Sequence, residues 1–241
     1  MGWLSSLPQH VRVVFYGEPE SIPAAASDRV HEFIPTEGLR AVSWCYLHHL
    51  LRTGRQAAGW TIFTNGQPFH FNHLFGQVLE LQSLWQEVQP LSFMHSRRLQ
   101  LPPMDALKRS RREWLGDCPV RREPFSLDTL NTLTFHQPAF ARLVAHYHQK
   151  FDTSRHRHLA HHFLELLGLG DIAAQAAEAM FGTYAHGSIF AVSADRLACL
   201  PEDSVAMALA LLERDQMLFG GLCDRFWLHL FGEAFLLPVE D

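Results

Sequence analysis

The sequence predicts a single α/β domain in which helices cover both faces of a mostly parallel sheet. Short apolar runs alternate along the chain with longer segments of helical period. The 241 residues, 47% of them hydrophobic and 19% charged, suit one packed domain better than two separate ones. The sequence shows no internal repeat and no low-complexity tract, so a repeat architecture is not expected.

Runs rich in β-branched and aromatic residues predict the strands, and segments with apolar residues every three or four positions predict the helices. The strands are expected at 11–16, 30–34, 60–64, 91–94 and 188–192. The helices are expected at 39–51, 72–85, 138–151, 155–167, 205–212 and 224–231. Ser193 is placed to cap a further helix, and Gly168 and Gly170 are placed to end the helix 155–167.

The middle of the chain interrupts this pattern. Residues 99–124 are rich in proline and charge and have no clean period, which predicts a less regular, helix-rich insertion over 99–185 within one domain, 1–241. The basic residues here, 108–112 with Arg121 and Arg122, are predicted to form a solvated face rather than a polyanion-binding patch.

Charge and cysteine usage narrow the class of protein. The formal net charge of -5 gives no field that would attract nucleic acid. Four widely spaced cysteines without a CxxC pair predict reduced thiols and no zinc finger. The N-terminus lacks the features of a signal peptide, and no apolar run has the length of a membrane span. The expectation is a soluble, cytoplasmic protein with a small-molecule partner.

The end of the strand 60–64 is the first candidate site. In parallel sheets, ligands bind beyond the carboxyl ends of the strands. The segment TNGQPFHFNHLF, residues 64–75, places several polar groups there, and neutral amides and imidazoles suit sugar hydroxyls or a base edge. The candidate substrate-binding residues are Asn65, Gly66, Gln67, His70 and His73. An ordinary strand-to-helix turn with cap residues explains the same segment.

Four blocks of the sequence resemble a known family. They are SWCYLHHLL (43–51), WTIFTNGQPF (60–69), GSIFAVSADRL (187–197) and DRFWLHLFGE (224–233). In this order they are similar to the uncharacterised family catalogued as domain of unknown function 3431. That family occurs among sugar-handling genes and looks like the nucleotide-sugar glycosyltransferases. The resemblance implies a glycosyltransferase-A-like α/β fold and transfer of a sugar from a nucleotide-sugar donor.

The resemblance also implies roles for particular residues. Asp224 matches a glutamate of the closing block and Glu18 a glutamate after the first strand, so either is a candidate catalytic base. Arg97 and Arg225 are candidates to bind the charged donor. Asp224 has a plainer interpretation as a helix cap or an ion-pair partner of a nearby arginine.

The sequence departs from that pattern at its acidic residues. No two aspartates lie two residues apart, so the Asp-x-Asp metal clamp of many glycosyltransferases is absent. Gln67 stands where the family often has an acidic residue. These losses argue against a tightly held divalent metal, which remains only an open possibility as cofactor. A non-catalytic ligand-binding protein of the same fold is therefore the alternative.

A histidine-rich segment, RHRHLAHHFLEL (155–166), offers a rival site. On a helix over 156–165, His158, His162 and Glu165 fall on one face, and two histidines four apart can bind a metal ion. The order HxxHHxxE lacks the glutamate between the histidines that serves a metalloprotease as base. A polar helix face that happens to be rich in histidine explains the segment equally simply.

Overall fold

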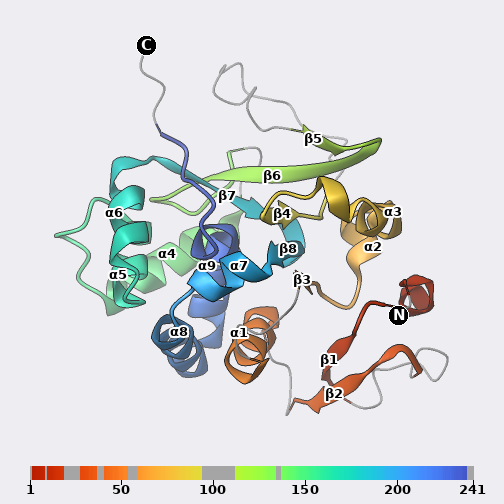
Figure 1. The fold of residues 1–241 in the computed structure, drawn as a ribbon. Helices are drawn as coiled ribbons and strands as arrows, with labels where there is room; N and C mark the ends of the chain where they lie inside the picture. The colour runs from red at the N-terminus through yellow and green to blue at the C-terminus, as the bar shows by residue number, and fades with distance from the viewer. Residues whose placement is uncertain are drawn as a thin grey trace.

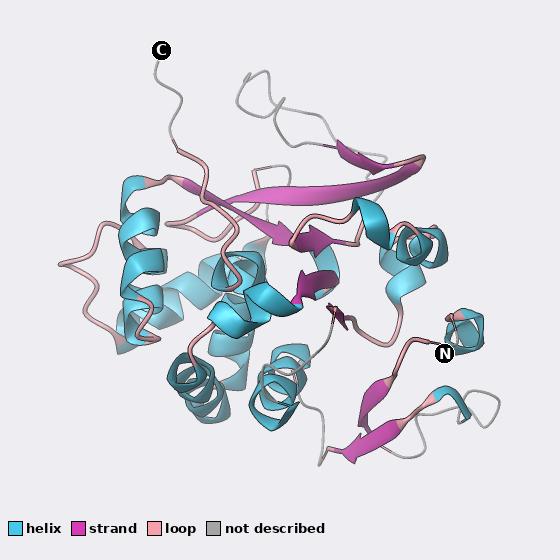
Figure 2. Ribbon diagram, viewed as in Figure 1, coloured by secondary structure: helices cyan, strands magenta, loops and turns pink. Residues whose placement is uncertain are grey.

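The computed structural model describes residues 2–8, 10–18, 28–36, 41–53, 59–93, 112–133 and 137–237. It shows a mixed α/β protein with three small sheets (Figures 1 and 2). The two-stranded sheet is parallel, and both three-stranded sheets are antiparallel. The predicted mostly parallel, glycosyltransferase-A-like sheet is therefore wrong.

The strands are short except for β6. The parallel pair is β1 (Val14–Gly17) with β2 (Glu32–Pro35). The second sheet has the order β3 (Trp60–Phe63), β8 (Phe190–Ser193), β4 (Val88–Pro90). The third has the order β5 (Arg112–Leu115), β6 (Cys118–Ser126), β7 (Phe181–Ala185). A backbone hydrogen bond of 3.0 Å from Arg121 N to Ser92 O joins β6 to the chain just after β4.

The helices surround these sheets. They are α1 (Val42–Thr53), α2 (Pro68–Phe71), α3 (Phe75–Glu80), α4 (Pro138–Lys150), α5 (Leu159–Leu166), α6 (Gly170–Glu178), α7 (Ala194–Cys199), α8 (Glu202–Arg214) and α9 (Gln216–Leu230). In Figure 1, α4 to α6 lie on the left, α2 and α3 on the right, and the β1–β2 ribbon at the lower right. No helix among the described residues has the length and apolar character needed to cross a membrane.

Strand order shows why the prediction of a parallel sheet failed. Alternating strands and helices give a parallel sheet only when consecutive strands become neighbours through a crossover. Here β8 comes from far along the chain and runs between β3 and β4 in the opposite direction. β5 and β6 form a hairpin whose turn contains Gly116 at φ +54°.

The predicted insertion contributes to the main structure. β6 is buried along nearly its whole length, and its charged residues mask the apolar pattern by which a strand is recognised. Arg121 and Arg122 are each only 7% exposed, so their predicted place on a solvated face is wrong. Arg122 Nε lies 3.1 Å from Glu233 Oε1, and Arg122 also donates to the Val88 carbonyl oxygen. Residues 108–111 lie outside the described residues.

Several local predictions are confirmed. Ser193 caps α7, because its Oγ accepts a hydrogen bond from Arg196 N. Gly168 follows α5 with φ +73°, the left-handed conformation that ends helices. In place of the predicted helix 72–85, the structure has α3 and a 3-10 turn over Gln82–Leu84, while α2 ends before that range.

The core lies on both sides of β8. Side chains of a strand alternate between its two faces, so Phe190 and Val192 pack toward α9, while Ile189 and Ala191 pack toward α3. On the α9 side, the rings of Phe63 and Trp227 stack at a centroid distance of 6.5 Å. α9 is therefore a central element of the fold, and its residues are fixed by packing on most sides.

A buried histidine ties α9 to β7. His229 is fully buried, its Nε2 accepts a hydrogen bond of 2.8 Å from Thr183 N, and its Nδ1 lies 2.8 Å from Glu233 O. Nδ1 therefore carries the proton, and its N–H donates a hydrogen bond to that carbonyl oxygen. Burial lowers the pKa of His229 to about 4.

This histidine makes stability dependent on pH. The unfolded chain binds a proton below an ordinary pKa of about 6.5, whereas the folded chain resists it until about pH 4. We therefore expect the free energy of unfolding to fall by about 3 kcal/mol between pH 6.5 and pH 4 from His229 alone. Urea unfolding of the wild type and His229→Gln across this range measures it. Equal pH dependence in the two proteins would contradict the assignment.

Candidate functional site

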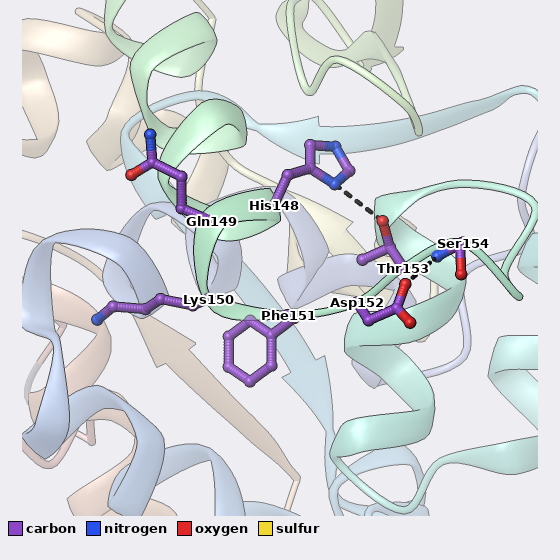
Figure 3. A pocket seen from close by; sticks show the side chains of 7 residues that line it. All are labelled: His148, Gln149, Lys150, Phe151, Asp152, Thr153 and Ser154. Carbon is purple, nitrogen blue, oxygen red and sulfur yellow. Dashed lines mark hydrogen bonds between the residues drawn. The ribbon is translucent and has the colours of Figure 1, made fainter.

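One shallow pocket lies at the end of α4, and none of the predicted site residues lines it. A single segment, residues 148–154, lines its volume of about 480 Å³ (Figure 3). Its polar groups bind one another: His148 Nδ1 lies 2.8 Å from Thr153 Oγ1, and Asp152 Oδ1 accepts from Ser154 N. Lys150 forms an ion pair with Asp215. The segment forms a closed local turn and is not the candidate site.

The turn between β7 and β8, His186–Ser188, has an unusual backbone. Gly187 and Ser188 both adopt positive φ angles, +67° and +56°. Serine rarely adopts this conformation, which costs about 1–2 kcal/mol and is found preferentially at functional sites. Gly187 is required for a second reason, since a Cβ there would come within 2.8 Å of the Phe71 ring. Surrounding contacts must therefore hold the turn in place.

Asp224 is the centre of those contacts. Its Oδ1 accepts hydrogen bonds of 2.9 Å from both Ser43 Oγ in α1 and Ser188 Oγ in the turn. Tyr46 Oη donates to the Ser188 carbonyl oxygen at 2.8 Å. Asp224 lies in the middle of α9, so the alternative prediction that it caps a helix is wrong. The capping residue of α9 is Asp215, which accepts from Leu218 N.

The two carboxylate oxygens of Asp224 differ in their hydrogen bonds. Oδ1 is committed to the serines, whereas Oδ2 has no hydrogen-bond partner within the part of the chain that the structure describes. The residue as a whole is partly exposed. Burial raises the pKa of the carboxyl above its ordinary value, and the two serine hydroxyls oppose this only in part. Asp224 thus combines a fixed orientation, one available oxygen and a raised affinity for protons.

The predicted strand-end segment reaches the same turn. Asn65 Nδ2 donates to the Gly187 carbonyl oxygen at 3.2 Å, and its Oδ1 accepts from Gln67 N at 2.8 Å. Asn65 and Asp224 therefore both bind the turn, at Gly187 and Ser188 respectively. Gly66 adopts no positive φ and has space for a Cβ, so the local backbone does not require glycine. The Gln67 side chain is exposed beside it.

The two predicted histidines of this segment separate. His70 lies in α2, exposed and within electrostatic reach of His186 in the turn. His73 lies between α2 and α3 and lines a second pocket of about 310 Å³ together with Phe69 and Leu74. The reason is that the helix begins at Pro68 and is interrupted at Asn72, so the two histidines do not lie on one helical face.

Arg225 is committed to the interior. Its side chain is 3% exposed, Nε donates to the Leu130 carbonyl oxygen, and the guanidinium lies 3.8 Å from the Phe140 ring centroid and 3.9 Å from that of Tyr184. It also donates to Gln137. These contacts give Arg225 a structural task in supporting β7, and its role in binding substrate stays a prediction.

The remaining predicted site residues lie apart or outside the described chain. Glu18 follows β1 and is exposed, and Figure 1 shows the β1–β2 ribbon well separated from α9. The two predicted catalytic carboxylates are thus on separate elements. Arg97 lies outside the described residues.

The predicted metal ligands do not converge. α5 begins at Leu159, so His158 is its cap, with Nδ1 accepting from His161 N and Nε2 within 2.9 Å of Ala176 O. His162 Nδ1 lies 2.6 Å from Tyr147 Oη. Glu165 instead pairs with His156 at 2.7 Å. Among the described residues, no three His, Cys, Asp or Glu side chains are grouped so that they could hold a metal ion.

Several residues at the turn were not predicted individually. They are Ser43, Tyr46, His186, Ser188 and Arg121. Ser43, Tyr46 and Ser188 belong to the sequence blocks that resemble the known family. The sequence therefore indicated these blocks, but not the individual residues. Nothing in the sequence indicated Arg121 or His186, because their place beside the turn depends on the pairing of β6 with β7.

The hydroxyl of Ser188 offers a test of this geometry. Ser188→Ala removes a buried hydrogen bond to Asp224 and is expected to destabilise the fold by about 1–2 kcal/mol. Ser188→Gly removes the same bond but also relieves the positive φ, so it is expected to be less destabilising than alanine. Urea unfolding measures both, with Ser83→Ala at an exposed position as control. A glycine variant no more stable than the alanine variant would show that the turn is unstrained.

All four sequence blocks meet at this turn. Block 43–51 supplies Ser43 and Tyr46, block 60–69 supplies Asn65, block 187–197 supplies Gly187 and Ser188, and block 224–233 supplies Asp224. Comparison of the chain with family models, curated proteins and solved structures finds no match. The resemblance to domain of unknown function 3431 therefore stays a prediction.

Proposed function

We propose that the protein binds a small polyhydroxylated molecule beside Asp224 and uses this carboxylate as a general base, in the transfer of a sugar from a nucleotide-sugar donor. The observation that carries the proposal is the state of Asp224. One oxygen is held by two serine hydroxyls, the other has no partner in the described chain, and burial raises the pKa of the carboxyl. Catalytic carboxylates combine these properties.

The chemistry follows from the available oxygen. A hydroxyl of the acceptor loses its proton to Asp224 Oδ2 while its oxygen bonds to the anomeric carbon of the donor. The bond from that carbon to the diphosphate breaks, and its electron pair leaves with the diphosphate. Because Oδ1 is fixed, Oδ2 keeps one direction, and such positioning lowers the barrier of the step. A raised pKa makes the carboxylate a stronger base.

Sugar chemistry is supported by two features of the chain. The groups gathered at the turn are mainly hydroxyls and amides, which match the hydroxyl groups of a sugar. The blocks that resemble a sugar-handling family are the ones that supply these groups. The proposal does not depend on the predicted parallel sheet, because the turn brings the residues together on an antiparallel one.

A non-catalytic binding protein is the second candidate. Two observations favour it: Asp224 Oδ1 joins α1, α9 and the turn, which is a structural task, and Glu18 lies on a separate element. In that case the same surface binds the sugar but no bond is broken.

The variant Asp224→Asn separates these candidates. Asparagine keeps an oxygen that accepts from Ser43 and Ser188, so the fold and ligand binding are expected to persist. It cannot take up the proton, so turnover is expected to fall by about 10²- to 10⁴-fold. Wild-type turnover is expected to increase with pH through a pKa above that of an ordinary aspartate. A thermal-shift panel of nucleotide sugars measures ligand binding, and an assay of nucleotide diphosphate release then measures turnover.

Asp203→Asn, at an exposed position of α8, is the matched control and should behave as the wild type. Undiminished turnover in Asp224→Asn would refute the catalytic role. Nucleotide-sugar binding without turnover in the wild type would establish the second candidate. If no member of the panel raised the melting temperature, the proposal would fail in both forms.

A further inference from the structure

Two buried donor atoms beside the turn, one on Arg121 and one on Ser92, make no hydrogen bond with any residue that the structure describes. Arg121 in β6 is 7% exposed and Ser92, just after β4, is 1% exposed. Within the described residues, neither Arg121 Nη2 nor Ser92 Oγ makes a hydrogen bond. Buried polar groups in folded proteins are nearly always paired, so two neighbouring exceptions need an explanation.

Strand pairing places both residues next to the 186–188 turn. The Leu91 N–H donates to the Ile189 carbonyl oxygen, which brings Ser92 level with Ser188 on the neighbouring strand. Arg122 is paired with Ala185, so Arg121 comes level with His186. The two residues are also neighbours of each other, because Arg121 N donates to Ser92 O at 3.0 Å.

The Arg121 side chain lies on the α9 side of the sheet. Glu123 is paired with Tyr184, and alternation along β6 puts Arg121 on the same face as Glu123. Glu123 Oε1 lies 2.8 Å from Arg121 Nε. This ion pair holds one side of the guanidinium and leaves Nη2 for another group. The Arg225 guanidinium lies on the same face, 3.9 Å from the Tyr184 ring.

The charges around this face balance until Asp224 takes up a proton. Two guanidinium groups, Arg121 and Arg225, are accompanied here by the carboxylates Glu123 and Asp224. Burial, with a further contribution from both arginines, lowers the pKa of His186 to about 4, so this imidazole is neutral at pH 7. Protonation of Asp224 during the proposed reaction would leave one positive charge in excess.

We propose that Arg121 and Ser92 form an oxyanion subsite that binds a phosphoryl group of the substrate. The inference rests on the proposed function and deepens it: Asp224 acts on the hydroxyl, and the subsite holds the charge of the departing diphosphate. The Arg121 guanidinium is a planar fork: its Nε pairs with Glu123, and its Nη2 is left to donate to a phosphate oxygen, while the Ser92 hydroxyl donates to another. Both unpaired donors are thereby satisfied.

Isothermal titration with sodium pyrophosphate, inorganic phosphate and UDP at constant ionic strength tests the subsite. Wild-type protein is expected to bind pyrophosphate and UDP more tightly than phosphate. Ser92→Ala and Arg121→Lys are each expected to weaken pyrophosphate binding by about tenfold or more, because lysine keeps the charge but loses the fork. Arg142→Gln, at an exposed position of α4, is the control and should leave binding unchanged.

Arg121→Gln alone would leave the Glu123 carboxylate buried without its partner. The double variant Arg121→Gln/Glu123→Gln removes the guanidinium and this carboxylate charge together, so it tests the role of the guanidinium in binding. It should fold and lose pyrophosphate binding. Wild-type affinities equal for pyrophosphate and inorganic phosphate, or unchanged affinity in Ser92→Ala and the double variant, would overturn the subsite. If nucleotide sugars bound independently of Arg121, only the subsite would fail. If pyrophosphate bound through Arg121 but nucleotide sugars did not bind, the subsite would stand and the sugar-transfer proposal would fail.

Discussion

Two hydrogen bonds to one oxygen of Asp224 hold the candidate site together. They join α1, α9 and the turn between β7 and β8, three elements that are far apart in the sequence. In the buried interior, a carboxylate is costly unless hydrogen bonds compensate it, so the serines make this placement possible. The same burial raises the pKa of the carboxyl. One arrangement thus explains both the architecture of the turn and its chemistry.

The fold supplies the rigidity that this arrangement needs. α9 is packed on most sides, and Phe63, Phe190 and Trp227 connect it to the central sheet. Gly187 fits tightly against Phe71, and Asn65 donates a hydrogen bond to its carbonyl oxygen. A turn with two successive positive φ angles can persist because contacts from three directions determine it. Conformational strain is therefore located where the proposed chemistry takes place.

Sequence patterns predicted the local structure better than the arrangement of the strands. The strand 60–64 and the helices 138–151 and 205–212 were recognisable because their apolar periods reflect burial on one face. β6 escaped notice because buried Arg121, Arg122 and Glu123 gave it the composition of a loop. The direction of β8 depends on which distant strands it pairs with, and a local pattern carries no such information. Asp224 and Asn65 were predicted, but the serine partners of Asp224 and the contact of Asn65 with Gly187 required the tertiary structure.

The protonation of Asp224 in the free protein tests the central claim most directly. The side-chain carboxyl carbon can be followed by NMR as a function of pH, and Asp224→Asn identifies its signal. The account predicts a titration above the ordinary aspartate pKa, and a further rise when Ser43 is replaced by alanine, because that hydroxyl lowers the value. A titration at or below the ordinary value would mean that Asp224 is a well-solvated anion, and the proposed base would lose its physical foundation.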